Sequence, residues 1–449
     1  MKLVYNVNDK PGLWKTIVFA LQQMLAILAA TIAVPAIIGN GMSQSAALFG
    51  AGVGTLVYLA FTKFKSPVFL GSSFAFLGSM GAAFGGAASV SVGYLGLIIG
   101  AILAGLVYVV IAIVVKFAGT SWIDKIMPAA VIGPTVAIIG LSLAGNAAGD
   151  LLKGSVGVYV GNVFIPNASP YVALVCGLVT LFTTIVCSVY GKKMLKMIPF
   201  IIGIVAGYIV ATIFTVIGNV ADVPALQVIN FALFENMEWI PKFTFIKAFE
   251  GFDGFSLSYF VTVLVAYVPV AFVVFAEHLS DHKNISSIIE ADLIKEPGLH
   301  RTLLGDGVGS MVGAFFGGCP NTTYGESVGC VAISGNASIV TIFTTAIICL
   351  LASFVGPFVT FLATIPSCVM GGVCIALYGF IAVSGLKMIQ KVDLNDNRNL
   401  FVVSVILIAG VGGLKLTFGE ITITSIACAL ILGIITNFIV NIKCKKCDK

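Results

Sequence analysis

The chain has 449 residues, of which 59% are hydrophobic and only 10% are charged, and its mean hydropathy is +1.09. Soluble domains carry about 25% charged residues, so this composition excludes an ordinary soluble protein. The formal net charge of +5 comes from lysines in the polar breaks, so it does not indicate nucleic-acid binding. Apolar stretches of about 20 residues recur along the whole chain, which predicts an all-α polytopic membrane protein.

Fourteen apolar segments follow one another between the polar breaks. The first, over residues 13–38, is too long for the core of a signal peptide and follows a polar lead, so we expect it to span the membrane. The third and tenth segments, PVFLGSSFAFLGSMGAAFGG and GGCPNTTYGESVGCVAISG, are short and rich in glycine. The segments begin near residues 14, 46, 68, 90, 127, 170, 197, 256, 302, 319, 337, 365, 398 and 420.

Positive charge gives the expected orientation of these segments. With a cytoplasmic N-terminus, 20 of the 24 Lys and Arg residues fall on the cytoplasmic side, and only Lys153, Lys242, Lys247 and Lys415 fall outside. This asymmetry follows the positive-inside rule, and removing one short segment would destroy it. We therefore predict a multi-pass protein of the cytoplasmic membrane with both termini in the cytoplasm.

Two segments resemble each other and suggest an internal repeat. IMPAAVIGPTVAIIG and TIPSCVMGGVCIALYG each have a valine three residues and a glycine five residues after their first proline. Seven spans per half would place the halves in opposite orientations, and inverted repeats with broken helices are typical of transporters. We expect residues 1–220 to form the first repeat, 221–255 a link and 256–449 the second repeat, with the paired breaks in segments three and ten.

Several acidic residues lie where apolar residues are expected. Glu277 ends segment eight in the stretch FAEHLSDHKN, Glu326 lies within segment ten, and Asp306 lies early in segment nine. A carboxylate at membrane depth costs about 2.5–3.5 kcal/mol on insertion scales, so such residues indicate a functional site. By contrast, we expect His278 and His282 at the cytoplasmic surface, because a long polar stretch follows them.

Segment ten also contains the residues that interrupt a helix. Pro320 donates no backbone hydrogen bond, and Gly325 tolerates dihedral angles that are closed to other residues. An extended turn followed by a helix would direct backbone N–H groups at a bound molecule. Segment three has a matching stretch, GSSFAF, at residues 71–76.

The candidate site thus combines two carboxyl groups with backbone amides and aromatic rings. A protonated carboxyl group presents one donor beside one acceptor, which complements the amide edge of a cyclic base. Flat rings favour a flat ligand, and the aromatic candidates are Phe74, Tyr324 and Tyr378. The set predicts binding of a nucleobase such as uracil.

Three motifs show a resemblance to a known family. They are FAEHLSDH at 275–282, PGLHRTLLGDGVGSMVGAFFGGCPNTTYGESVG at 297–329 and PSCVMGGVCIALYGFIAVSG at 366–385. With them the chain resembles, over essentially its whole length, the bacterial uracil permeases of the nucleobase–ascorbate transporter family. PNTTYGE points to the uracil branch of that family over the purine branch.

The resemblance implies a fold, a function and a set of site residues. It implies fourteen spans in two inverted repeats, divided into a core and a gate domain, with extended stretches in segments three and ten. The implied function is secondary transport of uracil into the cell, coupled to protons, often by a homodimer in membrane lipid, with no other cofactor. Substrate-binding residues carried over by motif are Glu277, Glu326, Gly325, Phe74, Tyr324, Tyr378 and Ala30.

Two positions depart from the family pattern and bear on proton coupling. Four residues after the first glutamate the well-studied branch has a histidine, whereas this chain has Asp281. A glutamine–histidine pair of the first span is here Gln22-Gln23. Fewer titratable groups remain, so Glu277, together with Asp281, is the expected proton-coupling group.

Other functions remain as alternatives. A xanthine or urate permease of the same family would differ only in cargo. An anion transporter on a similar scaffold is disfavoured, because no lysine or arginine falls inside segments three, eight or ten. An enzyme is not expected, since no metal-ligand set or nucleophile–base pair stands out within the spans. Cys444 and Cys447 form an isolated CxxC, whereas zinc sites generally need four ligands.

Overall fold

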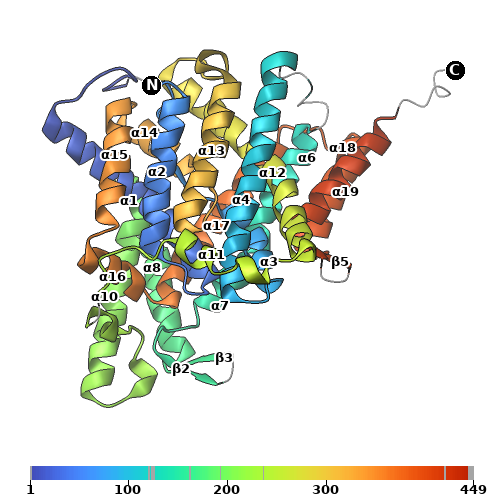
Figure 1. The fold of residues 1–449 in the computed structure, drawn as a ribbon. Coiled ribbons are helices and arrows are strands. Elements are labelled where there is room, and N and C mark those ends of the chain that lie inside the picture. Colours follow the sequence, from blue (N-terminus) through green and yellow to red (C-terminus); the bar gives the residue numbers. More distant parts are fainter. Residues whose placement is uncertain are drawn as a thin grey trace.

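The computed structural model describes residues 3–119, 122, 127–160, 163–192, 194–235, 237–418 and 421–442. Helices dominate the described residues, and the chain segments lie side by side in a single bundle (Figure 1). The first half contains α1 (Leu13–Ile38), α2 (Gln44–Phe61), β1 (Leu70–Ser72), the 3₁₀ turn η1 (Phe74–Phe76), α3 (Leu77–Gly85), α4 (Val90–Ala118), α6 (Ala129–Ser142), α7 (Ala144–Asp150), β2 (Gly157–Val160), β3 (Val163–Pro166), α8 (Pro170–Tyr190), α9 (Met194–Met197) and α10 (Pro199–Val220).

A connection with short helices joins this half to the next. It contains the 3₁₀ turns η2 (Pro224–Leu226), η3 (Phe231–Phe234) and η4 (Phe252–Gly254), and the helix α11 (Thr244–Phe249). The second half contains α12 (Leu257–Ile289), the π turn η5 (Ile294–Gly298), α13 (Leu299–Gly317), β4 (Asn321–Thr323), α14 (Gly325–Ser334), α15 (Ile339–Ala352), α16 (Gly356–Thr364), α17 (Ser367–Ile389), α18 (Asn397–Val411), β5 (Leu416–Phe418), β6 (Ile421–Ile423) and α19 (Ser425–Val440).

Many of these helices can cross a membrane. Among the described residues, eight are long and apolar enough, and the pair α15 and α16, bent by 85°, would make nine if it is one span. The protein is therefore a multi-pass membrane protein. Helix length does not establish the expected fourteen spans, because α18 and α19 have 15 and 16 residues and a full crossing takes about 20.

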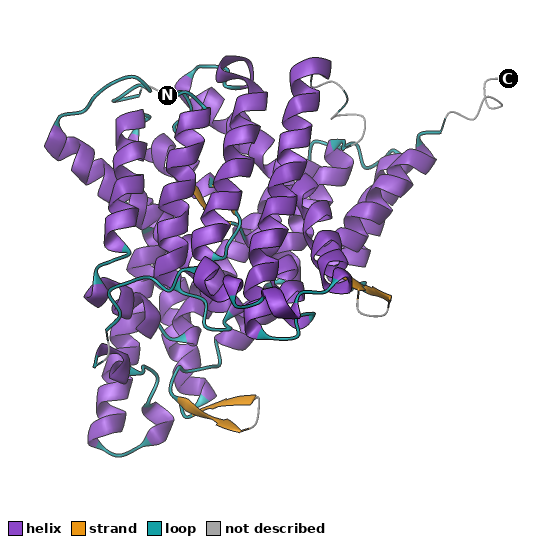
Figure 2. Cartoon of the chain, viewed as in Figure 1, coloured by secondary structure: helices purple, strands orange, loops and turns teal. Residues whose placement is uncertain are grey.

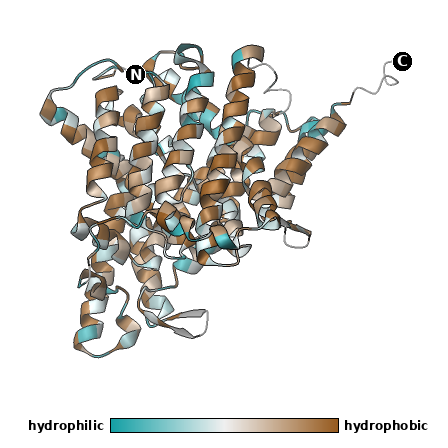
Figure 3. Ribbon diagram, in the orientation of Figure 1, coloured by the Kyte–Doolittle hydropathy of each residue, from teal (hydrophilic) through white to brown (hydrophobic). Residues whose placement is uncertain are grey.

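Hydrophobic residues dominate the helices throughout the bundle (Figure 3), and many of them are exposed on its outside while others are buried inside. On α4, for example, Val110, Ile113 and Phe117 are exposed, while the opposite face, with Tyr108 and Ala112, is buried. Hydrocarbon chains solvate such a surface, whereas water does not. The outward-facing residues of the long helices therefore suit a lipid environment.

Extended stretches do occur in segments three and ten, as the sequence predicts. β1 and β4 pair antiparallel in the register Leu70–Thr323, Gly71–Thr322 and Ser72–Asn321. The short pair lies inside the bundle, whereas the β2–β3 and β5–β6 hairpins lie at its periphery (Figure 2). Because buried strand edges need partners, two further bonds extend the pairing, from Ser73 N to Pro320 O and from Tyr324 N to Phe69 O.

Glycines bring α2 and α13 together beside this strand pair. A Cβ atom on Gly50 would lie only 2.4 Å from the carbonyl oxygen of Gly313, so any larger residue would force the helices apart. The close approach also exposes the Gly50 carbonyl to Asn321 of β4, whose Nδ2 donates to it at 3.0 Å. The helix pair thus fixes the position of the strand.

Candidate functional site

One large cavity lies where the strand pair meets α12, α14 and α17. Its volume is about 380 Å³, within the range of small-molecule sites. Of the residues predicted from sequence to form the site, six line it together: Phe74, Glu277, Asp281, Tyr324, Gly325 and Glu326. The two glutamates, which are 49 positions apart in the chain, therefore face a shared space.

The other two predicted residues lie behind the lining. Ala30 is 1% exposed, and Ala26, one helical turn earlier on α1, lines the cavity in its place. Tyr378 is 3% exposed, and its ring packs edge-on against the Phe74 ring with centroids 5.7 Å apart. Its neighbours Leu377 and Phe380 line the cavity instead. Tyr378 therefore packs behind the Phe74 ring and does not line the cavity itself.

Two helical elements begin at the cavity directly after the paired strands. α14 starts at Gly325 with Glu326 in its first turn, and η1 starts at Phe74 on the other side. The backbone N–H groups of a first helical turn have no partner within the helix, so they are available to a ligand. This is the arrangement expected from the break in segment ten.

The dihedral freedom that the sequence suggested for Gly325 is not used here, while substrate binding by its backbone N–H stays a prediction. Its φ angle is not positive, so no special backbone conformation requires glycine here. A Cβ atom at this position would instead lie 3.7 Å from Oδ1 of Asp281, on the cavity side. The glycine therefore keeps the space between α14 and the Asp281 carboxyl group open.

A buried hydrogen-bond set holds the start of α14. The Ser327 hydroxyl accepts from Gln23 Nε2 on α1 at 2.6 Å and from the backbone N–H of Phe69 at 3.1 Å. Ser327 and Gln23 are both buried, at 0% and 3% exposed. The helix start that carries Glu326 is thus tied to α1 and to the residue before β1.

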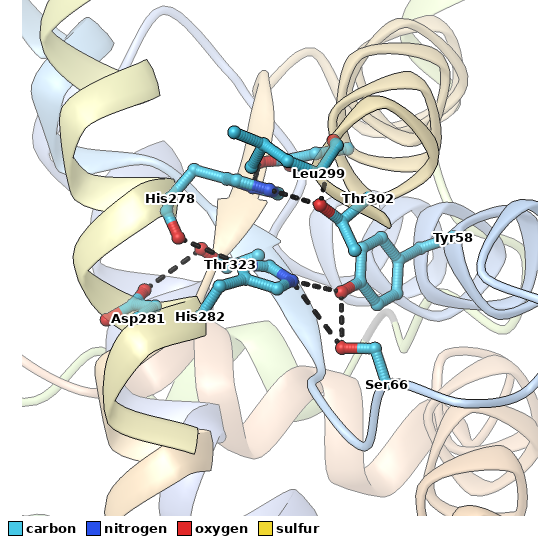
Figure 4. Close-up of polar contacts among 9 residues, drawn as sticks. Tyr58, Ser66, His278, Asp281, His282, Leu299, Thr302 and Thr323 are labelled. Atoms are coloured by element: carbon cyan, nitrogen blue, oxygen red, sulfur yellow. Dashed lines mark hydrogen bonds and ion pairs between the residues drawn. The ribbon is translucent and has the colours of Figure 1, made fainter. Parts of the chain in front are cut away.

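α12 presents one stripe of polar side chains to the cavity. Glu277, Ser280, Asp281 and Asn284 follow the i, i+3, i+4, i+7 spacing of one helix face, and all four line the cavity. Asp281 also joins α12 to β4, because its Oδ2 accepts from Thr323 Oγ1 at 2.9 Å (Figure 4). Ser280 and Asn284 were missed from sequence, although the same spacing from Glu277 would have found them.

The prediction that His278 and His282 lie at the surface is wrong. Both side chains are 0% exposed, because α12 continues through the polar stretch to Ile289 and turns these two residues toward the interior. His282 Nδ1 donates to the His278 carbonyl oxygen at 2.8 Å, and its Nε2 lies 2.7 Å from the Tyr58 hydroxyl (Figure 4). His278 contacts Asp306 and Thr302 of α13.

The charges around the cavity are mostly acidic. Glu277, Asp281 and Glu326 line it, and Lys196 of α9 is the basic residue among the described lining residues. Lys196 is exposed, and no sequence pattern connected it to the site. Within the described part of the chain, no group of three or more His, Cys, Asp or Glu side chains could hold a metal ion. Cys444 and Cys447 lie outside the described residues.

Solved structures show that this fold occurs in other transporters. The chain aligns with the transmembrane domain of the cyanobacterial bicarbonate transporter BicA with a TM-score of 0.62 and 16% identity, covering 97% of this chain and all of that one. It aligns with the murine anion transporter Slc26a9 in its inward-facing state with a TM-score of 0.65 and 14% identity, covering 96% and 69% of the two chains. These low identities establish a shared fold only.

Sequence relatives give a more specific result. The chain is 37% identical to a uracil permease of Bacillus caldolyticus and 38% identical to one of Bacillus subtilis, each over 98% of this chain and 95% of the relative. It is 34% identical to a uracil permease of Escherichia coli over 96% of this chain and 92% of the relative. A family model described as "Permease family" matches residues 14–418. The chain is thus a membrane transporter rather than an enzyme, and it belongs to the permease family of the bacterial uracil permeases, the nucleobase–ascorbate transporters.

Proposed function

We propose that this protein imports uracil across the cytoplasmic membrane together with protons. The observation that carries the proposal is that Glu277 and Glu326 line one cavity beside the start of α14. Relatives that match nearly the whole chain bear the name uracil permease, which supports the choice of base. These names favour uracil over the xanthine or urate alternative.

The cavity offers each kind of group that a uracil ring needs. A protonated carboxyl group of Glu277 would donate to a ring carbonyl and accept from the adjacent N–H. Glu326 and the backbone N–H groups at Gly325 and near Phe74 would bind the remaining polar edge. The rings of Phe74 and Tyr324 would pack against the flat base, for which their apolar faces are suited.

Coupling would follow from the protonation of Glu277. Glu277, protonated from the outside, would bind the base. Release of this proton to the cytoplasm would then weaken binding. Asp281, on the same face of α12, is the second candidate for the group that carries the proton. One positive charge moved inward gains about 2.3 kcal/mol per 100 mV of membrane potential, which is enough for accumulation of tens of fold.

The proposed architecture has fourteen spans in two inverted repeats, at residues 1–220 and 256–449, joined by a link at 221–255. Core and gate domains would each draw helices from both repeats, and the site would lie between them. The cavity lining runs along α12 to Asn284 and along α17 to Met388, and it includes Lys196. If both termini lie in the cytoplasm, as predicted, these positions would also lie toward the cytoplasm and the cavity would open inward. Assembly as a homodimer stays a prediction.

The shared fold with anion transporters does not outweigh these arguments. The N–H groups at the start of α14 would suit an anion, but the three carboxyl groups that line this cavity would repel one when ionised. Lys196 adds one positive charge, but it is an exposed side chain. We therefore retain uracil as the proposed cargo.

Uptake of labelled uracil into proteoliposomes tests the proposal. We expect accumulation driven by an inward proton gradient, competition by unlabelled uracil and little competition by xanthine or bicarbonate. Glu277→Gln should abolish gradient-driven accumulation, because an amide cannot exchange a proton, whereas Glu250→Gln in the link should leave uptake unchanged. Full gradient-driven uptake by Glu277→Gln would refute the role of this carboxyl group, and uptake of xanthine in place of uracil would refute the cargo.

A further inference from the structure

A buried histidine–aspartate pair lies behind the cavity and takes no part in the proposed transport chemistry. Nδ1 of His278 on α12 lies 2.6 Å from Oδ2 of Asp306 on α13, and the two side chains are 0% and 2% exposed. Neither residue lines the large cavity. The pair therefore joins two helices at a buried place outside the cavity lining.

The hydrogen bonds on the other side of the His278 ring show where its protons lie. Thr302 Oγ1 donates to the carbonyl oxygen of Leu299 at 3.0 Å, so its single proton is already used. His278 Nε2, 3.0 Å from the same Oγ1, must then be the donor in that contact (Figure 4). Nε2 therefore carries a proton.

The short contact to Asp306 needs a second proton. With Nε2 protonated, a neutral His278 would present a bare Nδ1 to a carboxylate, and two lone pairs would face each other at 2.6 Å. One proton must lie between them, either on Asp306 or on an imidazolium ring. In both forms the pair has no net charge, which avoids the cost of an uncompensated buried charge.

The surroundings support a neutral pair. Asp306 Oδ1 has no hydrogen-bond partner among the described residues, and the residue lines a cavity of only about 10 Å³ that Tyr108 also lines. A net negative charge with one oxygen unpartnered would be costly in this place. The other titratable groups nearby are Tyr108 on α4, His282 stacked on the His278 ring at 4.0 Å, Tyr58 of α2 beyond it, and Glu277 and Asp281 on α12.

We propose that His278 and Asp306 hold one proton that stays with the protein throughout transport, and that this pair positions α12 so that Glu277 faces the cavity. Because His278 follows Glu277 directly, fixing its ring against α13 also fixes the rotation of α12 about its axis. The pair is thus a positioning device, distinct from the exchangeable proton proposed for Glu277.

The proton content of the pair can be measured without any transport assay. The chain has three histidines, so ¹⁵N-histidine labelling of the full-length protein in lipid nanodiscs gives few signals, and His278→Gln and His300→Gln variants assign them. We expect His278 to keep a protonated Nε2, to show at Nδ1 the shift of a nitrogen that bears or accepts the shared proton, and to show no titration between about pH 5 and pH 8, where an ordinary histidine titrates; an Nδ1 signal of a bare nitrogen would overturn the proposal. A bare Nε2, or a His278 signal that titrates in this range, would overturn the proposal.

Uptake separates positioning from proton coupling, and this arm rests on the proposed uracil transport. Asp306→Asn can still hydrogen-bond His278 but cannot hold the extra proton, so gradient-driven accumulation and its pH profile should stay within about 2-fold of the wild type. Asp306→Ala leaves His278 unpaired, which should raise the half-saturating uracil concentration about 10-fold.

Loss of gradient-driven accumulation by Asp306→Asn, with uracil exchange retained, would show that the pair carries the coupling proton and would overturn the proposal. Unchanged half-saturation in Asp306→Ala would overturn the positioning role. If the wild type transports no uracil, the proposed function fails, while the ¹⁵N measurement still decides whether the pair holds its proton.

Discussion

Single residues determine the shape of the cavity wall at Tyr324, one of the residues that line it. Gly71 of β1 lies against the ring of Tyr324, where a Cβ atom would come within 2.3 Å of a ring carbon. The Tyr324 hydroxyl donates to the carbonyl oxygen of Ser72 at 2.8 Å, so the ring cannot move away without losing a buried hydrogen bond. Because Tyr324 directly precedes α14, a displaced ring would also disturb the start of that helix.

We therefore expect Gly71→Ala to weaken uracil binding. Overpacking of this kind costs about 1–3 kcal/mol, which corresponds to roughly a 10-fold rise in half-saturating concentration if the strain falls on the binding conformation. Gly78→Ala on α3 is the matched control, since no heavy atom lies within 4 Å of its Cβ position. Equal uptake kinetics in the two variants would contradict the claim that Gly71 is needed to leave room for the Tyr324 ring.

At the residue scale the sequence predicted the cavity only in part. Glu277 and Glu326 stood out because carboxyl groups are rare in apolar segments, and both line the cavity, while their role in binding uracil stays a prediction. The surface placement predicted for His278 and His282 is wrong because a polar stretch ordinarily ends an apolar helix, whereas α12 continues through it to Ile289. Helical spacing from Glu277 distinguishes the two histidines from the cavity-lining residues. His278 and His282, one and five positions after Glu277, lie on a different face of α12 from the residues three, four and seven positions after it.

Among the elements, the contact between α2 and α13 controls the strand pair. Gly50 allows these helices to approach, and its carbonyl oxygen receives the Asn321 side chain. Thr55 of α2 adds a second connection, because its Oγ1 accepts from Leu70 N at 2.9 Å. One helix thus contacts both strands.

Gly50→Ala should therefore lower the stability of the whole bundle. The added methyl group would meet the Gly313 carbonyl, and we expect a loss of about 1–3 kcal/mol, visible as a lower melting temperature of the purified protein in detergent. Gly145→Ala, in α7, should leave the melting temperature nearly unchanged, because its Cβ position has no neighbour within 4 Å. A Gly50→Ala protein that melts with the wild type would rule out close packing at this crossing.

The broken segments were predictable from sequence, but their pairing was not. Proline and glycine in the tenth segment indicated an interrupted helix, and an extended stretch is present there. The register of Gly71 with Thr322, by contrast, depends on how α2 and α13 pack, which no local pattern contains. The number of crossings is open for a similar reason, since α18 and α19 are short and their path through the bilayer depends on neighbouring helices.

At the scale of the whole molecule, the pairs of basic and acidic side chains among the described residues are either buried or exposed to solvent. His278–Asp306 is buried, whereas Lys65 and Glu296 form an exposed pair between the end of α2 and the turn before α13. The hydrogen bond from Lys65, and then its charge, lowers the pKa of the Glu296 carboxyl group. Solvent screens such a pair, so it contributes little to stability.

Lys65→Gln should accordingly lower the melting temperature only slightly at neutral pH. Because the folded pKa of Glu296 lies below its unfolded value, the small contribution is present above the unfolded pKa and is lost as the pH falls through the folded pKa. The difference between variant and wild type should thus vanish in acid. A difference that persists or grows in acid would assign another role to Lys65.

The pairing of β1 with β4 has a consequence for synthesis of the protein. About 250 residues separate the two strands, so β1 leaves the ribosome long before its partner exists. Main-chain N–H and C=O groups without hydrogen-bond partners are poorly tolerated in lipid. The β1 segment of the nascent chain must therefore stay in a shielded or hydrated environment until β4 has been synthesised. The site is therefore among the last features of the molecule to assemble, and a chain that stops before Asn321 cannot form it.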